Sequence, residues 1–200
     1  MSLVITASNN LRYSAMASSM KSENPIEVWT IGHSTRSSEE FTALLMTHKI
    51  KLLVDVRSFP GSRRYPQFNR TTLSETLPEV GVMYAHLPSL GGRRKPNVDS
   101  KNTAWKNASF RAYADYMETE EFKEGIKELL ELAREDRTAI MCAEAVWWRC
   151  HRSLIADYLK AQGLLVTHII DSTHTQPHPY TSAARIVDGD LSYEGLLSGA

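Results

Sequence analysis

The sequence predicts one α/β domain built on a mainly parallel, five-stranded sheet that is flanked by helices. Two patterns along the chain indicate this class. Short apolar runs alternate with longer segments whose apolar residues recur at the spacing of an amphipathic helix. In addition, 200 residues with 42% hydrophobic and 23% charged side chains suffice for one domain with a full core. Strands that alternate with helices are typical of right-handed β-α-β units, in which the strands run parallel.

Five short, mostly apolar segments are predicted as the strands. They span residues 27–31, 51–56, 81–86, 138–142 and 164–170. Long loops follow the second and third of these strands. The loop after the third strand extends to about residue 108, well beyond the ~2–6 residues that are usual for such connections. Long loops inside a compact domain are often functional, so we expect these two to contribute to a site.

The segments between the strands carry helix signals. Ser37 and Glu40 form a capping box, and Thr119 is suited to cap a later helix. Further helices are expected from Thr72 or Ser74 to Glu79, over residues 110–117, and from about Trp148 to Gly163. The expected apolar faces comprise Phe41, Leu44, Leu45 and His48 in the first helix and Phe122, Ile126, Leu129, Leu130 and Ala133 in the helix capped by Thr119.

The two ends of the chain differ from the middle. Residues 1–25 are rich in Ser, Asn, Met and Ala and are predicted to be a disordered tail, with an organellar transit peptide as the alternative. Residues 26–170 form the predicted α/β domain. Residues 171–200 are polar and are expected to be an irregular tail, with one short helix near residues 193–197.

Cysteine usage and hydropathy indicate the environment of the protein. No apolar run approaches the length of a membrane span, so no membrane partner is expected. Two cysteines eight positions apart do not make the disulfide framework of a small secreted domain. The sequence therefore predicts an intracellular, cytoplasmic protein.

Chemically reactive residues follow four of the predicted strands at their carboxyl ends. Gly32 and His33 follow the first strand, Asp55 ends the second, His86 ends the third and Cys142 ends the fourth. The carboxyl ends of parallel strands meet at one rim of a sheet, where α/β proteins place their ligands. We therefore expect these segments to converge on one site, provided that the four strands are parallel.

The charge is sorted along the chain although the formal net charge is zero. Acidic residues concentrate in the helical segment 117–136, whereas arginines concentrate in the loops at the expected rim. Guanidinium groups bind phosphate and carboxylate in a bidentate manner, so the sequence predicts an anion-binding cleft. The alternative is that these arginines are solvated or paired with acids such as Asp55 and Glu144. The candidate anion-binding residues are Arg57, Arg63, Arg64, Arg93, Arg94, Arg149 and Arg152.

Two cysteines and three histidines are candidates for chemistry at the rim. Cys150 is expected in the first turn of the last helix, where a thiol ionises more easily and becomes a nucleophile or redox group. Cys142 is equally consistent with a reactive thiol and with a small apolar strand residue. The acid–base candidates are His33, His86 and His151, with Asp55 and Glu144 as orienting carboxylates. His48 and His168 are expected to be structural, and His174 and His178 to have no role.

Several motifs, taken in order, resemble the DUF488 family, a domain of unknown function. They are WTIGHST at 29–35, VDVRS at 54–58, PGSRRYPQFN at 60–69, HLPSLGG at 86–92, MCAE at 141–144 and CHR at 150–152. The resemblance covers about residues 27–170. It implies an α/β fold and the grouping of these motifs, but it implies neither a reaction nor catalytic residues.

These observations lead to one favoured function and two alternatives. The favoured function is an enzyme acting on a phosphate-bearing or other anionic substrate, such as a nucleotide or nucleic acid. A non-catalytic nucleic-acid-binding module is the first alternative, with Tyr65, Trp105, Trp147 and Trp148 as candidates for base stacking. A protein-interaction domain is the second. No cofactor is assigned, although Cys142, Glu144, Cys150 and His151 include ligand types that bind metals.

Overall fold

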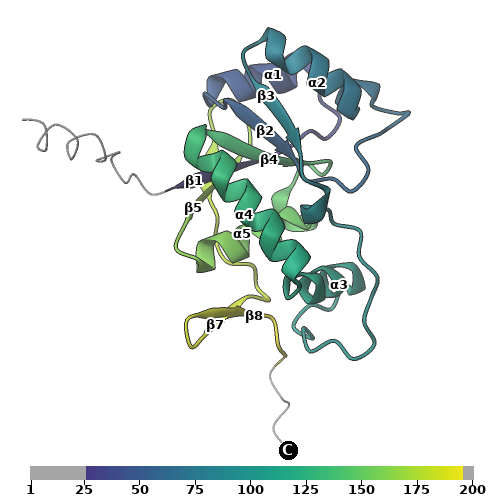
Figure 1. Ribbon diagram of the computed structural model, residues 1–200, viewed down its shortest axis with the longest axis vertical. Helices are drawn as coiled ribbons and strands as arrows, with labels where there is room; N and C mark the ends of the chain where they lie inside the picture. Colours follow the sequence, from purple (N-terminus) through teal and green to yellow (C-terminus); the bar gives the residue numbers. More distant parts are fainter. Residues whose placement is uncertain (1–25, 196–200) are drawn as a thin grey trace, which may run out of the picture.

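A computed structural model describes residues 26–195, and a six-stranded sheet organises this part of the chain (Figure 1). The strands lie in the order β3-β2-β4-β1-β5-β6. All neighbouring pairs are parallel except β5 and β6, which are antiparallel. The sheet consists of β1 (Glu27–Gly32), β2 (Leu52–Asp55), β3 (Met83–His86), β4 (Thr138–Cys142), β5 (Leu165–Ile169) and β6 (Thr175–Pro177).

Helices cover both faces of the sheet. One hydrophobic cluster joins the strands to α1 (Ser38–Thr47) and α2 (Arg70–Glu79). A second cluster joins them to α3 (Ala108–Met117), α4 (Glu120–Glu135) and α5 (Arg152–Ala161). Figure 1 shows α4 and α5 in front of the strands. The predicted α/β class with a mainly parallel sheet is thus confirmed.

Alternation along the strands explains the two clusters. Val28 in β1 and Ile140 in β4 belong to the cluster with α4 and α5, whereas their neighbours Trp29 and Ala139 belong to the cluster with α1 and α2. Successive side chains of a strand point to opposite faces, and a sheet covered on both faces buries both sets. This is why these strands are apolar throughout instead of alternating between apolar and polar residues.

The register of the strands brings their carboxyl ends together. Gly32 pairs with Cys142, and Asp55 pairs with both His86 and Met141. The chain leaves β1 and β2 toward α1 and α2 but leaves β3 and β4 toward the helices of the opposite face. Loops that diverge from neighbouring strands open a crevice at the rim, which is the usual ligand position in such sheets. The predicted convergence of the motifs is therefore present.

Most predicted elements are present, with corrections at their starts. The capping box of Ser37 and Glu40 and the cap at Thr119 are confirmed. However, α2 begins at Arg70, earlier than predicted, and α3 begins at Ala108 because Asn107 caps it. The predicted start of the last helix at Trp148 is wrong, because a short 3₁₀ helix, η3 (Trp147–Arg149), and an extended Cys150 precede α5.

Three short strands lie within the segment after residue 170 that the sequence predicts as irregular, and the other described residues of this segment are outside helices and strands. The short strand β6 adds a sixth strand to the predicted five, and β7 (Arg185–Val187) forms a hairpin with β8 (Asp190–Ser192). The hairpin turns at Asp188 and Gly189, which both have positive φ, as a two-residue Asp-Gly turn requires. β6 has only three exposed residues and includes Pro177, so it carries no alternating pattern.

Two remaining predictions concern the ends of the chain. The tail predicted for residues 1–25 lies outside the described residues. The helix expected near residues 193–197 is absent from residues 193–195, and its other residues are not described. Between residues 26 and 195, no helix combines the length and the apolar character needed to cross a membrane.

Candidate functional site

A cleft of about 370 Å³ opens at the carboxyl rim of the sheet. The loops after β2 and β3, the start of α3 and the turn between β4 and α5 surround it. The lining residues are Arg57, Ser58, Phe59, Gly92, Arg93, Ser109, Phe110, Cys142, Ala143, Glu144, Arg149, Cys150 and His151. Seven of the candidates from the sequence therefore share one cleft, namely Arg57, Arg93, Cys142, Glu144, Arg149, Cys150 and His151.

Arg152 is buried behind this cleft without a carboxylate partner. Its side chain is 1% exposed, and within residues 26–195 it forms no ion pair. Nη1 donates to the carbonyl oxygens of Ile31 (3.2 Å) and Glu144 (2.7 Å) and lies 2.7 Å from Sγ of Cys142. Nη2 donates to the carbonyl oxygen of Ala145 at 2.9 Å. Carbonyl dipoles and a sulfur atom thus surround a buried positive charge.

The glycine of the first motif makes room for this arrangement. A Cβ at Gly32 would lie 1.8 Å from the carbonyl oxygen of Glu144 and 2.7 Å from Nη1 of Arg152. The end of β1 and the turn after β4 are therefore in closer contact than any side chain allows. This close approach of backbones is the physical reason for glycine at position 32.

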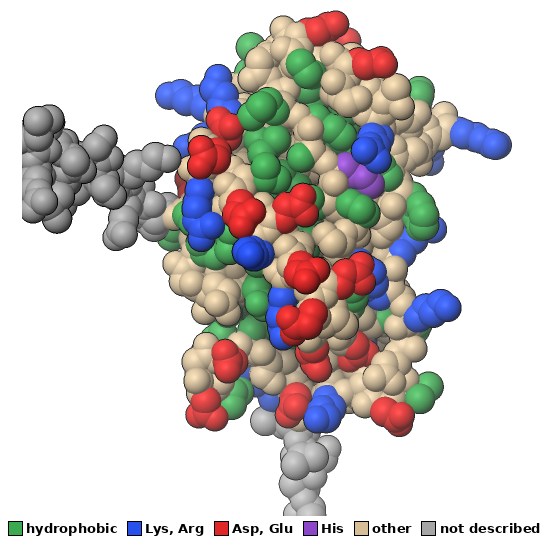
Figure 2. Space-filling model, viewed as in Figure 1, with side chains coloured by type: hydrophobic (Ala, Val, Ile, Leu, Met, Phe, Trp, Pro, Cys, Tyr) green, Lys and Arg blue, Asp and Glu red, His purple; other side chains and the backbone are tan. Residues whose placement is uncertain are grey.

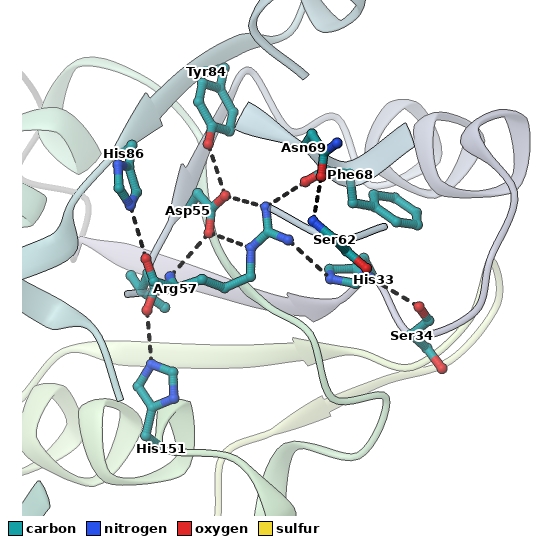
Figure 3. A network of polar contacts seen from close by, with 11 residues as sticks. His33, Ser34, Asp55, Arg57, Ser62, Phe68, Asn69, Tyr84, His86 and His151 are labelled. Atoms are coloured by element: carbon teal, nitrogen blue, oxygen red, sulfur yellow. Dashed lines mark hydrogen bonds and ion pairs between the residues drawn. The ribbon is translucent and has the colours of Figure 1, made fainter. Parts of the chain in front are cut away.

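Cys150 and His151 form a thiol–imidazole pair at the floor of the cleft. Sγ of Cys150 lies 3.4 Å from Nδ1 of His151. Nε2 of His151 donates to the carbonyl oxygen of Val56 at 3.0 Å (Figure 3), which leaves Nδ1 as the acceptor that faces the thiol. Burial lowers the pKa of His151, so the imidazole is neutral near pH 7. This arrangement gives a thiol, an adjacent base and a group that orients the base.

The loop after β3 packs against the His151 ring at a glycine, Gly92. A Cβ at Gly92 would lie 2.4 Å from Nδ1 of His151. The carboxylates of Asp55 and Glu144, which the sequence suggests as orienting groups, make no hydrogen bond to His151 in the described chain. A backbone carbonyl orients this imidazole instead, and a backbone partner leaves no residue-type signal in a sequence.

The two cysteines differ in acidity. Burial alone would raise the pKa of Cys150, but the Cys142 thiol, the Arg152 charge and the Arg152 backbone N–H together lower it below its usual range. Burial and the adjacent Cys150 raise the pKa of Cys142 well above that of a free thiol. Cys150 lies two residues before α5 and not in its first turn as predicted. It still faces the positive end of the helix dipole.

A second buried arginine, Arg57, is paired with a carboxylate (Figure 3). Nε and Nη2 of Arg57 donate to the two oxygens of the fully buried Asp55 at 2.8 and 2.5 Å. Nη2 also donates to the carbonyl oxygen of Phe68, and Nη1 donates to Nε2 of His33 at 3.2 Å. The hydroxyl of Tyr84 donates a further hydrogen bond to Asp55 at 2.8 Å. The guanidinium group of Arg57 is therefore engaged within the protein.

His33 and His86 lie beside this pair and do not line the cleft. Nδ1 of His33 donates to the carbonyl oxygen of Ser34, and burial lowers the pKa of His33 to about 4. Nε2 of His86 donates to the carbonyl oxygen of Arg57 at 2.9 Å. Both imidazoles brace the loop after β2, and Figure 3 shows their bonds to this loop.

The other predicted arginines divide between the cleft and the outer surface. Arg93 and Arg149 are exposed at the cleft. Arg94 instead donates to backbone carbonyls of the loop after β3, with its guanidinium carbon 3.3 Å from the ring centre of Tyr116. Arg63 and Arg64 are exposed outside the lining. Figure 2 shows acidic side chains gathered over α4, which agrees with the sorting of charge seen in the sequence.

A chain of buried histidines ties the C-terminal segment to the sheet. His168 forms hydrogen bonds with Thr30 through Nδ1 and with His178 through Nε2. Nε2 of His178 in turn contacts Asp157 at 3.0 Å. His168 is structural, as predicted. His178, for which the sequence suggests no role, is 3% exposed and holds the segment after β6 against α5. Trp147 stacks on His168 at 4.5 Å, so it is an anchor and not a free stacking surface.

Several lining residues are not among the candidates predicted from the sequence. Phe59 and Phe110 supply aromatic walls, and Ser58, Gly92 and Ser109 supply small polar or open positions. Ser58 and Gly92 end two of the sequence motifs, and for the others only the length of the two rim loops indicates a contribution. Among residues 26–195, no group of three or more His, Cys, Asp or Glu side chains has the arrangement of a metal site.

Comparison with known proteins places this site in a family. Neither the curated proteins nor the solved structures contain a match to the chain. The family described as "Domain of unknown function DUF488" matches residues 37–159, more than half of the chain, in agreement with the resemblance of the motifs. The chain therefore belongs to the DUF488 family.

Proposed function

We propose that the protein is an enzyme that uses Cys150 as a nucleophile on a phosphate-bearing or other anionic substrate held in the cleft. One observation carries this proposal. The Arg152 guanidinium is buried, lies 2.7 Å from Sγ of Cys142, lowers the pKa of Cys150 and has no carboxylate partner in the described chain. A buried charge without a counter-charge is costly, and a thiolate is the group nearby that can balance it.

His151 supplies the second part of the proposed chemistry. Its Nδ1 faces the Cys150 thiol at 3.4 Å, and its other nitrogen is held by the Val56 carbonyl. In this scheme the thiol proton moves to Nδ1, the thiolate bonds to an electrophilic centre of the substrate as the bond to the leaving group breaks, and the imidazolium gives its proton to the leaving group. Water then cleaves the sulfur–substrate bond and restores the thiol. A nucleophile, a base and an orienting group are the arrangement that activates cysteine in many unrelated enzymes.

Arg93 and Arg149 supply the proposed contact with the anion. Both line the cleft, both are exposed, and neither forms an ion pair within residues 26–195. The α3 helix begins at the same cleft with Ser109 and Phe110, so the positive end of its dipole favours an anion there. The aromatic rings of Phe59 and Phe110 favour a substrate that carries an apolar part next to its charge.

Alkylation kinetics test the nucleophile. The rate of iodoacetamide modification of Cys150 would be measured from pH 5 to 10 by mass spectrometry of peptides. We expect the rate to rise with pH around a midpoint that lies below the pKa of free cysteine, which is about 8.5. We also expect Cys150→Ser to remove the fast phase. If Cys150 reacts no faster than a free thiol at pH 7, the proposal fails.

Ligand titration tests the anion. Purified protein would be titrated calorimetrically with inorganic phosphate, nucleotides and phosphorylated sugars at low salt. Arg149→Gln and Arg93→Gln are expected to weaken binding at least tenfold, because each removes a charge from the cleft. Arg63→Gln is the matched control, since Arg63 is exposed but lies outside the lining. Equal losses in all three variants would argue against a specific cleft.

The alternatives from the sequence make different predictions in the same assays. A nucleic-acid-binding module would bind single strands with an affinity that falls steeply with salt and would show no need for Cys150. A protein-interaction domain would bind none of the small anions. We keep an intracellular location as part of the proposal, because two unpaired cysteines suit a reducing compartment.

A further inference from the structure

We infer that Cys142 and Cys150 form a reversible intramolecular disulfide when the protein meets a hydroperoxide. The turn between β4 and α5 is then a site of oxidation as well as a candidate catalytic site. This inference goes beyond the proposed function, because it needs the two thiols and the cleft but no particular substrate.

The placement of the two cysteines supports the disulfide. Both are unpaired, both line the same cleft, and both belong to one cluster of buried side chains. The two thiols also shift each other's pKa in opposite directions, and Sγ of Cys142 contacts the guanidinium of Arg152, two residues after Cys150. A disulfide requires a movement that brings the two sulfur atoms to about 2.05 Å.

The chain between the cysteines can supply that movement. Of residues 143–149, only Trp147 is buried, and the segment ends in the short helix η3. Cys150 has an extended backbone, so it is not fixed within a helix. By contrast, Cys142 ends β4 in register with Gly32 of β1. We therefore assign the movement to Cys150 and its turn.

The oxidation requires two steps. In the first, the Cys150 thiolate attacks one oxygen of the hydroperoxide, an S–O bond forms, and the O–O bond breaks. The leaving hydroxide or alkoxide takes the proton that His151 received from the thiol. In the second, the Cys142 sulfur attacks the resulting sulfenic acid, an S–S bond forms, and water leaves with the Cys142 proton. Two thiols are oxidised, and the peroxide is reduced.

Arg152 explains why Cys142 becomes reactive only in the second step. While Cys150 is a thiolate, burial and this neighbouring negative charge raise the pKa of Cys142. The sulfenic acid is neutral, so the unfavourable charge disappears, while Nη1 of Arg152 remains 2.7 Å from Sγ of Cys142. The guanidinium then favours the Cys142 thiolate, which is the resolving nucleophile.

Mass spectrometry after mild oxidation tests this inference. The full chain would be treated with stoichiometric hydrogen peroxide, quenched with excess alkylating reagent under denaturing conditions, and digested without reductant. We expect a cross-linked peptide pair that contains Cys142 and Cys150, a loss of both free thiols, and full recovery with a dithiol reductant. Alkylated Cys142 beside sulfinic or sulfonic Cys150 in the wild type would overturn the inference.

Two variants separate the two steps. Cys142→Ser should stop at the sulfenic acid, which dimedone labels on Cys150, and should form no internal cross-link. Cys150→Ser should leave Cys142 unoxidised under the same conditions, because Cys142 lacks an adjacent base. If Cys142 alone is oxidised in Cys150→Ser as fast as the pair in the wild type, the assigned order is wrong.

The outcomes for the two proposals are distinguishable. Iodoacetamide alkylation and anion titration of the reduced protein depend on Cys150 and the arginines, and they are independent of disulfide formation. Fast alkylation of Cys150 without any cross-link would retain the proposed function and remove only the disulfide. Formation of the disulfide without anion binding would retain the disulfide and remove the proposed function.

Discussion

Two buried arginines at the same rim of the sheet have opposite electrostatic environments. Arg57, after β2, is held by both oxygens of Asp55, and Tyr84 donates to the same carboxylate. Arg152, at the start of α5, has backbone carbonyls and the sulfur of Cys142 around it. The first charge is neutralised inside the protein, whereas the second is not.

The two arginines therefore have different roles, Arg57 in the structure of the cleft and Arg152 in the chemistry of the thiols. The Arg57–Asp55 pair joins the start of the long loop to the end of β2, so it shapes one wall of the cleft. It has little charge left for a ligand. The Arg152 site keeps a positive potential in a region of low dielectric, where a charge acts more strongly on its neighbours than in water. We therefore expect the stability of the fold to depend on the Arg57–Asp55 pair and the reactivity of the thiols to depend on Arg152.

The largest expected effect comes from breaking the carboxylate pair. Asp55→Asn keeps the shape of the side chain but leaves Arg57 as a buried charge without its counter-ion. Breaking a buried pair in this way costs about 3–5 kcal/mol. The free energy of unfolding in urea should fall by that amount.

A matched carboxylate-to-amide change provides the control for this experiment. Glu120→Gln removes the partner of Lys123 in an exposed pair whose Glu120 side chain is 80% exposed. Exposed pairs contribute little because solvent screens them, so the unfolding midpoint should hardly move. Equal stability of Asp55→Asn and Glu120→Gln would mean that the buried charge of Arg57 does not need Asp55 as its counter-ion.

The next effect concerns reactivity and not folding. Arg152 lowers the pKa of Cys150, so Arg152→Met should raise it and reduce the thiolate fraction at pH 7. The midpoint of the rate–pH profile should therefore shift upward. For each unit by which the pKa rises, the alkylation rate at a pH below the pKa falls about tenfold. Iodoacetamide kinetics across the pH range measure both quantities.

Arg152→Lys distinguishes charge from packing in this comparison. Lysine retains the positive charge but not the planar group that reaches three carbonyl oxygens. We expect its rate–pH profile to lie closer to wild type than that of Arg152→Met. If both variants give the same profile, packing and not charge controls the acidity of Cys150. Circular dichroism and thermal unfolding would verify that each variant is folded.

The sequence predicts the fold where local signals agree with the layers. Residues 138–142 are correctly predicted as a strand, and Ser37 with Glu40 correctly marks the start of α1. The edge strand β6 is missed because it is short, exposed and paired on one side only. The hairpin after it could be predicted from Asp188 and Gly189, whose combination is typical of a tight turn.

The site is predictable in its location but not in the direction of its side chains. Parallel strands bring Gly32 and Cys142 together, and this follows from strand order along the chain. Arg149 and Arg152 stand in the same turn, yet the first is exposed at the cleft and the second is 1% exposed beside Cys142. Nothing in their residue type distinguishes them, because backbone carbonyls provide the partners of Arg152.

The smallest expected effect tests how strongly the Asp55 side of the comparison is supported. Burial and the adjacent carboxylate raise the pKa of Tyr84, so its hydroxyl is a donor to Asp55 at all ordinary pH values. Tyr84→Phe removes this one donor while Arg57 still holds both carboxylate oxygens. We expect a loss of about 1 kcal/mol, less than for Asp55→Asn, because Tyr84 is only half-buried.

The same variant should leave the thiol side untouched. Tyr84 does not line the cleft, so the rate–pH profile of Cys150 alkylation should overlay that of the wild type. Tyr180→Phe is the control, because its hydroxyl has no hydrogen-bond partner within residues 26–195. A loss with Tyr84→Phe as large as that with Asp55→Asn would mean that the tyrosine, and not the arginine, holds the carboxylate. A shift in the alkylation profile would mean that the two buried arginines are coupled through the rim rather than independent.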